Sequence, residues 1–191
     1  MTGGLEVICG PMFSGKTGEL LRRLRRHEIA GRKVILLRPE IDVRYSENEV
    51  VSHNGDKMWA EYVPNEFNFF SSSNLMNKTL GSDVDIVGID EIQFFDPAFI
   101  NDIMIISYHK RLIITGLDTN YRFEPFGMVP QLMSLADKVD KLTAICNVCG
   151  EEATRTQRLV DGKPASISGE EVLVGGNETY QARCRDCYEI R

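Results

Sequence analysis

The chain has 191 residues, of which 42% are hydrophobic and 26% charged, so disorder is excluded as its main property. Its 22 basic and 28 acidic side chains leave a net charge of −6, which disfavours a dedicated nucleic-acid binder, because such domains usually carry a basic surface. Nucleotide binding stays open, since it needs only local positive charge. No apolar run approaches the ~20 residues of a membrane span, and the N-terminus has no signal-peptide pattern. We therefore expect a cytoplasmic protein that binds neither membrane nor nucleic acid.

Predicted strands and helices alternate along most of the chain. Short β-branched runs indicate strands, and leucines at helical spacing indicate a helix that stops at Gly31. Residues 44–80 are less regular, and we expect a mobile loop at 67–73 followed by a helix into Gly81. Such alternation predicts a parallel sheet with helices on both faces. The predicted strands are 5–9, 34–37, 84–89, 111–117 and a last one beginning at 142–146, and the predicted helices are 17–30, 97–107 and 130–136.

A glycine-rich motif, GPMFSGKT, lies between the first predicted strand and the first predicted helix. It matches G-x-x-x-x-G-K-[ST], in which backbone N–H groups and the positive end of the helix bind phosphate. Lys16 is expected to reach the β- and γ-phosphates, and the Thr17 hydroxyl to ligate Mg²⁺. A chance glycine-rich turn is the alternative, which the full match in this context disfavours. The predicted phosphate-binding residues are Gly10, Pro11, Met12, Phe13, Ser14, Gly15, Lys16 and Thr17.

Two adjacent carboxylates, Asp90 and Glu91, follow the strand predicted at 84–89. A P-loop enzyme needs an acidic residue at the end of a neighbouring strand to help hold Mg²⁺. A second carboxylate at this edge can accept a proton from an attacking hydroxyl or water. Because adjacent residues at a strand end point to opposite sides, we predict that Asp90 serves Mg²⁺ and Glu91 faces the acceptor. Without the P-loop, a solvated strand end would be an equal interpretation.

Four of the five cysteines form two C-x-x-C pairs, Cys146 with Cys149 and Cys184 with Cys187. Together they complete a tetrahedral sulfur site without an open position, so the predicted zinc is structural. Reduced, unligated cysteines are the alternative. An odd cysteine total without a secretion signal argues against a disulfide framework. The lone Cys9 lies in an apolar strand and is expected to be a buried structural thiol.

The composition shifts to polar residues and glycine after Cys146. This predicts a P-loop α/β domain at 1–141 and a small zinc-binding domain at 142–191. From its residues alone, the chain is a P-loop phosphotransferase or NTPase with a structural zinc. A P-loop NTPase acting on nucleic acids is the alternative from another class, against which the acidic balance and the small size stand.

Five segments follow one another in order: GPMFSGKT followed by ELLRR, IDEIQFF at 89–95, GLDTNYRFEPFG at 116–127, LADKVDKLTAIC at 135–146 and VGGNETYQARCRDC at 174–187. Together they resemble one family closely, the zinc-bearing type II thymidine kinases. The resemblance implies a P-loop NTPase-like parallel sheet flanked by helices, with a small C-terminal zinc-stapled lasso domain. It implies transfer of the γ-phosphate of ATP to the 5′-hydroxyl of thymidine to give dTMP, with Mg²⁺ and a structural zinc. It also implies a homotetramer and feedback inhibition by thymidine triphosphate. A kinase for a different deoxynucleoside is a further alternative.

Matched position by position, the resemblance assigns roles to individual residues. Glu91 is the general base on the 5′-hydroxyl, and Asp42 and Arg44 lie near the phosphates and the sugar. From the residues alone, Tyr121, Phe126 and Tyr180 would be interpreted as core aromatics. One departure is Gly18, where the family usually has Thr or Ser; it weakens the first helical turn but removes no ligand. The implied ATP-binding residues include Asp90, Glu91, Ile92 and Gln93; the implied deoxynucleoside residues are Met12, Phe94, Leu117, Tyr121 and Phe126; the implied lasso residues over the thymine are Glu171, Val172, Leu173, Val174, Gly175 and Tyr180.

Overall fold

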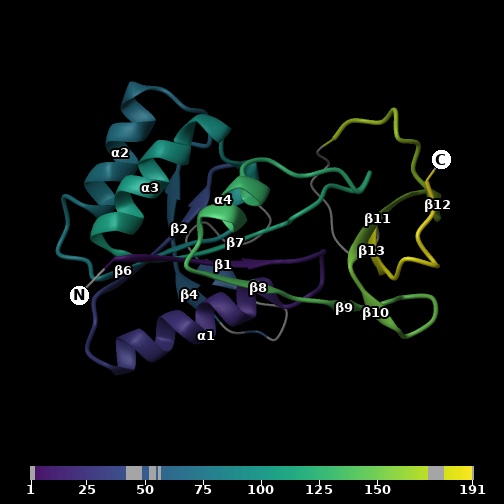
Figure 1. The fold of residues 1–191 in the computed structure, drawn as a ribbon, viewed down its shortest axis with the longest axis horizontal. Coiled ribbons are helices and arrows are strands. Elements are labelled where there is room, and N and C mark those ends of the chain that lie inside the picture. The colour runs from purple at the N-terminus through teal and green to yellow at the C-terminus, as the bar shows by residue number, and fades with distance from the viewer. Residues whose placement is uncertain (1–2, 42–48, 52–54, 56, 172–178, 191) are drawn as a thin grey trace.

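A six-stranded parallel sheet forms the centre of the computed structural model, which describes residues 3–41, 49–51, 55, 57–171 and 179–190 (Figure 1). The strand order is β5-β2-β6-β7-β1-β8, and every pairing in it is parallel. Strand β7 therefore lies between β1, which leads into the P-loop, and β6, which leads into Asp90 and Glu91. The strands are β1 (Gly4–Cys9), β2 (Val34–Pro39), β5 (Glu61–Val63), β6 (Ile86–Ile89), β7 (Arg111–Gly116) and β8 (Lys138–Lys141).

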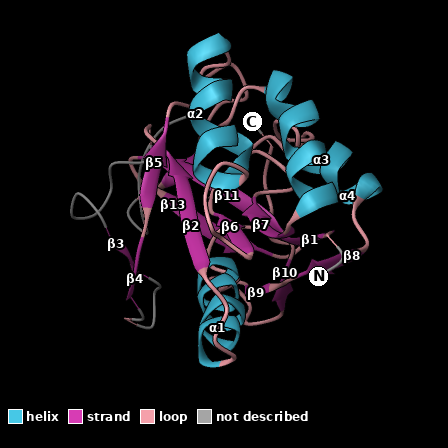
Figure 2. Ribbon diagram, turned by 90° about the vertical axis from the view of Figure 1, so that its left-hand side faces the viewer, coloured by secondary structure: helices cyan, strands magenta, loops and turns pink. Residues whose placement is uncertain are grey.

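Helices cover both faces of this sheet, as predicted (Figure 2). Helix α1 (Lys16–Ile29) packs on one face, where Leu20, Leu21 and Leu24 are buried in one apolar cluster with Ile8. Helices α2 (Phe69–Thr79), α3 (Ile100–His109) and α4 (Val129–Leu135) lie on the other face, over a second cluster that includes Val7. Neighbouring strand residues thus enter opposite cores, as the alternation of side chains along a strand requires.

The C-terminal segment, residues 142–190, adds short antiparallel pairs beside the sheet (Figure 1). Strand β9 (Ala144–Ile145) pairs with β10 (Glu152–Ala153), and β11 (Arg155–Val160) pairs with both β12 (Lys163–Pro164) and β13 (Tyr180–Arg183). A further pair joins β3 (Glu49–Val51) and β4 (Lys57–Trp59). The buried cluster of the C-terminal segment consists of small residues, Ala144, Cys146, Ala153, Ala182 and Cys184.

Two local predictions need correction. The loop expected at 67–73 is wrong, because α2 already begins at Phe69. The Asn68 side chain accepts hydrogen bonds from the backbone N–H groups of Phe70 (2.9 Å) and Ser71 (3.0 Å), which makes it an effective N-cap. The strand predicted at 142–146 shrinks to Ala144–Ile145, since the sixth strand of the sheet is the preceding charged stretch, 138–141.

The remaining predicted boundaries shift by only a few residues. The helix expected at 97–107 begins with a 3₁₀ turn, η2 (Pro97–Phe99), and continues to His109. A second 3₁₀ turn, η1 (Ile92–Phe94), directly follows the carboxylate pair. The strand expected at 84–89 begins at Ile86. Cys9 is fully buried, and burial raises the pKa of its thiol to about 11, so it is the structural thiol that was predicted.

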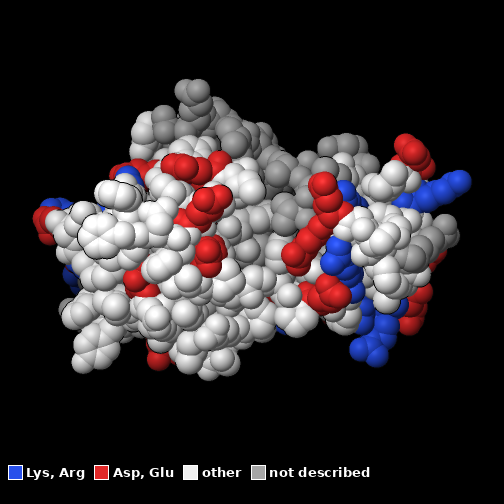
Figure 3. All heavy atoms as spheres, turned by 90° about the horizontal axis from the view of Figure 1, so that it is seen from above, with Lys and Arg blue, Asp and Glu red and all other residues white. Residues whose placement is uncertain are grey.

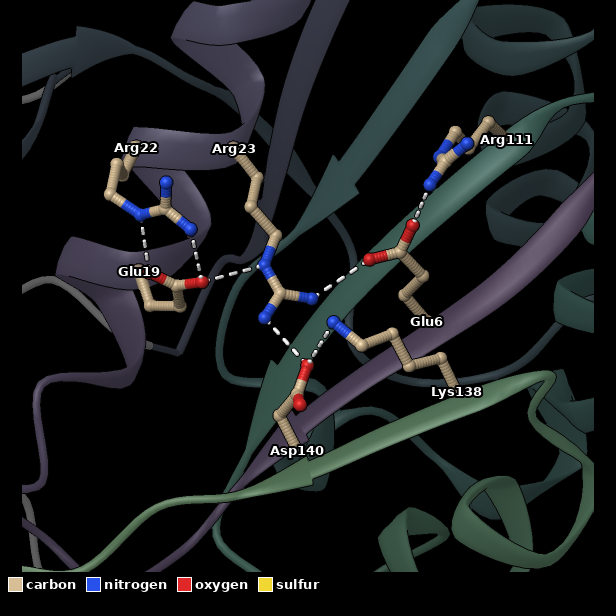
Figure 4. Close-up of polar contacts among 7 residues, drawn as sticks. All are labelled: Glu6, Glu19, Arg22, Arg23, Arg111, Lys138 and Asp140. Carbon is tan, nitrogen blue, oxygen red and sulfur yellow. Dashed lines mark hydrogen bonds and ion pairs between the residues drawn. The ribbon is translucent and has the colours of Figure 1, made fainter.

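An ion-pair network fastens α1 to the sheet (Figure 4). The Arg23 guanidinium donates hydrogen bonds to Glu19 (2.8 Å) on its own helix, to Glu6 (2.8 Å) on β1 and to Asp140 (2.6 Å) on β8. The side chains of Arg23 and Glu6 are only 12% and 10% exposed, so solvent screens this pair less than a surface pair. The network holds the helix that follows the P-loop against the strand that precedes it.

The surface charge differs between the two parts of the chain on the face drawn in Figure 3. On the part that holds α2, α3 and α4, most of the charged side chains in view are acidic, whereas basic and acidic side chains are mixed over the C-terminal segment. Within the described residues, no helix combines the length and the apolar character needed to cross a bilayer.

Candidate active site

The P-loop joins β1 to α1 through residues with left-handed backbone. Gly10 has φ +141°, and a Cβ on it would lie 2.3 Å from the Leu142 carbonyl oxygen, so only glycine fits there. Gly15 (φ +81°) and Phe13 (φ +65°) are also left-handed. The Ser14 hydroxyl donates to the Pro11 carbonyl across the turn (2.8 Å). These turns form the compact loop before a helix N-terminus that phosphate binding requires.

Lys16 is buried inside this loop. Its ammonium donates to the Pro11 carbonyl (2.7 Å) and lies 3.5 Å from the Ser14 hydroxyl. Burial lowers the pKa of Lys16, and the nearby carboxylates of Glu91 and Asp90 oppose that shift. Lys16 is thus close enough to both carboxylates at the carboxyl edge of the sheet to interact with them electrostatically.

Asp90 is buried at the end of β6 and accepts hydrogen bonds from both sides. The Thr17 hydroxyl lies 3.2 and 3.4 Å from its two carboxylate oxygens, and the Glu91 backbone N–H donates to it (3.1 Å). The hydroxyl of Thr115, fully buried on β7, donates to the same carboxylate. Sequence reasoning missed Thr115, although it is the one hydroxyl in the apolar run at 112–116; only the strand order shows that it faces Asp90.

Glu91 directly follows Asp90, and its side chain accepts a hydrogen bond from the side chain of Gln93 (2.5 Å). The Glu91 backbone is left-handed (φ +55°), an uncommon conformation that is often found at functional sites. Gln93 is itself buried, and its carbonyl oxygen accepts from the Leu117 backbone N–H (3.1 Å). Gln93 therefore ties the Glu91 carboxylate to the chain that leaves β7.

Several of the residues expected near the deoxynucleoside come together beyond the P-loop. Tyr121 and Tyr180 are buried with Ala165, and Met12 and Phe13 pack against them. The Met12 backbone N–H donates to the Thr156 hydroxyl on β11 (3.0 Å). The tip of the P-loop thus contacts the C-terminal segment directly.

The other expected nucleoside residues are not members of this cluster, and several fall outside the described part of the chain. Phe94 and Phe126 form an edge-to-face pair with ring centroids 6.0 Å apart. Glu171 is exposed and accepts from the Asn120 amide (3.0 Å). Six expected residues, Asp42, Arg44, Val172, Leu173, Val174 and Gly175, fall outside the described residues.

The four paired cysteines converge at the base of the C-terminal segment. Their sulfur atoms all lie within 4.8 Å of one another, and those of Cys149 and Cys184 are 3.6 Å apart. A tetrahedral zinc site with Zn–S bonds of ~2.3 Å has sulfur atoms about 3.8 Å apart, so the cluster is compatible with structural zinc. Burial opposes ionisation of Cys146, but backbone N–H groups, among them that of Cys184, outweigh it and lower the pKa of Cys146 to about 6.

A P-loop on one strand and an Asp-Glu pair at the same sheet edge define a P-loop phosphotransferase. The family model for thymidine kinase matches residues 3–188. The chain therefore belongs to the thymidine kinase family, which are ATP-dependent kinases that phosphorylate thymidine. Its substrates as a member of this family are ATP and thymidine.

Proposed function

We propose that this chain transfers the γ-phosphate of ATP to the 5′-hydroxyl of thymidine with the residues gathered at the carboxyl edge of the sheet. Residues 10–17 bind the phosphates through backbone N–H groups, and Lys16 supplies the charge at the β- and γ-phosphates. The buried position of the Lys16 ammonium supports this role, because a cation held inside the loop needs little reorganisation to bind an anion.

Thr17 and Asp90 would hold the Mg²⁺ that accompanies ATP. Both offer oxygen ligands, which Mg²⁺ prefers, and the two side chains are already within hydrogen-bond distance of each other. When bound, the cation neutralises charge on the phosphates. Thr115 would keep the Asp90 carboxylate in place from the other side.

Glu91 would act as the general base. The observation that supports this role is the chain of hydrogen bonds from Glu91 through Gln93 to Leu117, which orients the Glu91 carboxylate. The 5′-hydroxyl loses its proton to Glu91 as its oxygen attacks the γ-phosphorus, and ADP leaves. Met12, Tyr121 and Tyr180, together with Phe94 and Phe126, would surround the nucleoside.

The wider organisation belongs to the same proposal. The chain would divide into a P-loop domain at 1–141 and a lasso domain at 142–191 that a zinc ion at the four cysteines stabilises. Clustered thiols favour a reducing compartment such as the cytoplasm. Assembly as a homotetramer and feedback inhibition by thymidine triphosphate rest on the family resemblance alone.

The decisive experiment measures ADP release from ATP with a panel of nucleosides and, separately, with single-stranded DNA. We expect ADP release to depend on thymidine and to be insensitive to DNA. If another deoxynucleoside were preferred, the chain would be a kinase for that nucleoside instead of thymidine. Robust ATP hydrolysis with DNA, together with no response to thymidine, would instead support the nucleic-acid-dependent NTPase.

A further inference from the structure

Arg158 is a buried cation that no step of the proposed reaction uses. It lies on β11 and is only 8% exposed. One guanidinium nitrogen donates to the Glu170 carbonyl (2.6 Å), and its Nε atom is buried without a hydrogen-bond partner among the described residues. Burying a charged group costs free energy unless the group is paired. The buried position of Arg158 therefore needs a structural or functional reason.

The Arg158 guanidinium also lies over the ring of Tyr121, with its central carbon 5.1 Å from the ring centroid. This distance is within the range of a cation–π interaction. In the antiparallel pairing of β11 with β13, Arg158 is directly opposite Tyr180, so the two side chains emerge on the same face. Arg158 is therefore next to both tyrosines of the cluster at the P-loop tip.

Tyr121 is held by further contacts to the same stretch of chain. Its hydroxyl lies 3.1 Å from the Ser166 carbonyl and 3.2 Å from the Gly169 carbonyl. Arg122 donates to that hydroxyl (3.2 Å) and to the Gly169 carbonyl, but its side chain is more exposed than that of Arg158. Residues 166–170 and the Tyr121 ring thus form one connected unit around the Arg158 guanidinium.

We propose that Arg158 is a positioning residue for the nucleoside. It sets the Tyr121 ring and the backbone at Glu170, and through strand pairing the start of β13 at Tyr180, without contacting the phosphates. The inference rests on the proposed function, because Tyr121 and Tyr180 matter for catalysis only if they face the acceptor. It predicts an effect on thymidine binding that is separate from ATP binding.

The test compares Arg158→Met with the native protein in steady-state kinetics. We expect the KM for thymidine to rise about 10- to 100-fold, the loss typical of one charge-assisted hydrogen bond. The KM for ATP and the zinc content should stay near their native values. Arg158→Lys keeps the charge but not the planar guanidinium. Its KM for thymidine should lie between those of the native protein and Arg158→Met. The rise in melting temperature that thymidine causes should shrink in the same order.

Arg22→Met is the control, since Arg22 lies on the exposed side of α1 and donates to Glu19 rather than to the tyrosine cluster. It should leave the KM for thymidine unchanged. A normal KM for thymidine in a folded Arg158→Met protein would overturn the inference. A parallel rise of both KM values with loss of zinc would also overturn it, because Arg158 would then be a structural residue only. If the native protein itself shows no thymidine-dependent ADP release, the proposed function fails first and the inference falls with it.

Discussion

The sheet region and the C-terminal segment contribute to one site but are stabilised in different ways. The sheet buries two apolar clusters, one on each face, with side chains such as Leu20, Ile86 and Phe99. The C-terminal segment buries alanines and cysteines together with polar side chains, among them Arg155 and Arg158. It is too small for a large core, and it has a cluster of four cysteines that is compatible with structural zinc, together with arginine–aromatic contacts.

This difference predicts that the two parts of the proposed site depend on different interactions. The phosphate loop and the carboxylates belong to the well-packed sheet, whereas Tyr180 and the partners of Tyr121 belong to the segment that we propose zinc stabilises. Variants in the two parts should therefore lose different properties, such as metal binding, catalytic rate or stability. The predictions below run from the largest expected effect to the smallest.

The largest effect should come from removing the sulfur site. Cys184→Ser should abolish zinc binding, for which structural sites typically contribute ~10–16 kcal/mol. We expect residues 142–190 to become protease-sensitive and thymidine phosphorylation to be lost, while the sheet still binds an ATP analogue. Elemental analysis, limited proteolysis and analogue binding measure the three parts. A native protein without zinc would contradict the proposal that zinc stabilises the C-terminal segment.

Glu91→Gln should have the next largest effect, on chemistry alone. Loss of a general base typically lowers the rate by ~10²–10⁴, so kcat should fall by about that factor. Binding of ATP and thymidine should change little, because the amide keeps the shape of the side chain.

Glu61→Gln, which alters a surface ion pair with Lys78, is the control and should keep native kcat. Near-normal kcat in Glu91→Gln would show that Glu91 is not the base. If Glu91→Gln abolished ATP binding instead, the roles of Asp90 and Glu91 would have to be exchanged.

Thr115→Val should produce a smaller, metal-specific effect. The change removes the hydroxyl that donates to Asp90 and keeps the volume of the side chain. Partners of metal-binding carboxylates typically affect metal affinity by 10- to 100-fold, and we expect the Mg²⁺ concentration for half-maximal rate to rise about 10-fold. Direct titration with Mn²⁺ should show the same loss without turnover. Thr115→Ser, which keeps the hydroxyl, should have the native Mg²⁺ requirement. An unchanged Mg²⁺ requirement in Thr115→Val would mean that Thr115 has a structural role only.

The smallest effect concerns stability at acid pH and only the sheet region. Hydrogen bonds from Arg22 and then Arg23 lower the pKa of Glu19 to about 2, from an ordinary value of 4.5. The depressed pKa means that Glu19 stabilises the fold above about pH 4.5 and that this contribution disappears as the pH falls towards 2.

Because these pairs are close to the surface, we expect Glu19→Gln to cost about 1 kcal/mol of unfolding free energy at neutral pH. Denaturant titrations at about pH 6 and about pH 3 should show the gap between native and variant proteins narrowing. A gap that is independent of pH would mean that Glu19 acts through packing.

Sequence reasoning predicted the features whose chemistry depends on local spacing. The P-loop, the Asp90–Glu91 pair and the two cysteine pairs are contiguous motifs, and the apolar strands β1, β6 and β7 follow simple hydrophobic runs. Strand β8 was missed because its side chains are mostly charged. Its Asp140 pairs with Arg23 on a helix far away in sequence, and such a partner has no local signal.

The missed site residues share this long-range origin. Thr115 reaches Asp90 because β7 lies next to β6 in the sheet. Arg158 lies beside Tyr180 because β11 pairs with β13 in a register that puts these two residues opposite each other. Strand order and register decide both contacts. The helix start at Asn68 had a local signal, since Asn68 and Ser71 form a capping box, but the exposed Phe69 and Phe70 obscured the helical pattern.

Met12 belongs to the phosphate loop and, at the same time, packs against the tyrosine cluster that we propose receives the acceptor. Its N–H group is fixed on Thr156 while its side chain packs near Tyr121 and Tyr180. Under the proposed function, donor and acceptor share this structural element, so binding of one substrate can alter the affinity for the other. Thermodynamic linkage makes this coupling reciprocal: whatever factor ATP applies to the dissociation constant of thymidine, thymidine must apply to that of ATP.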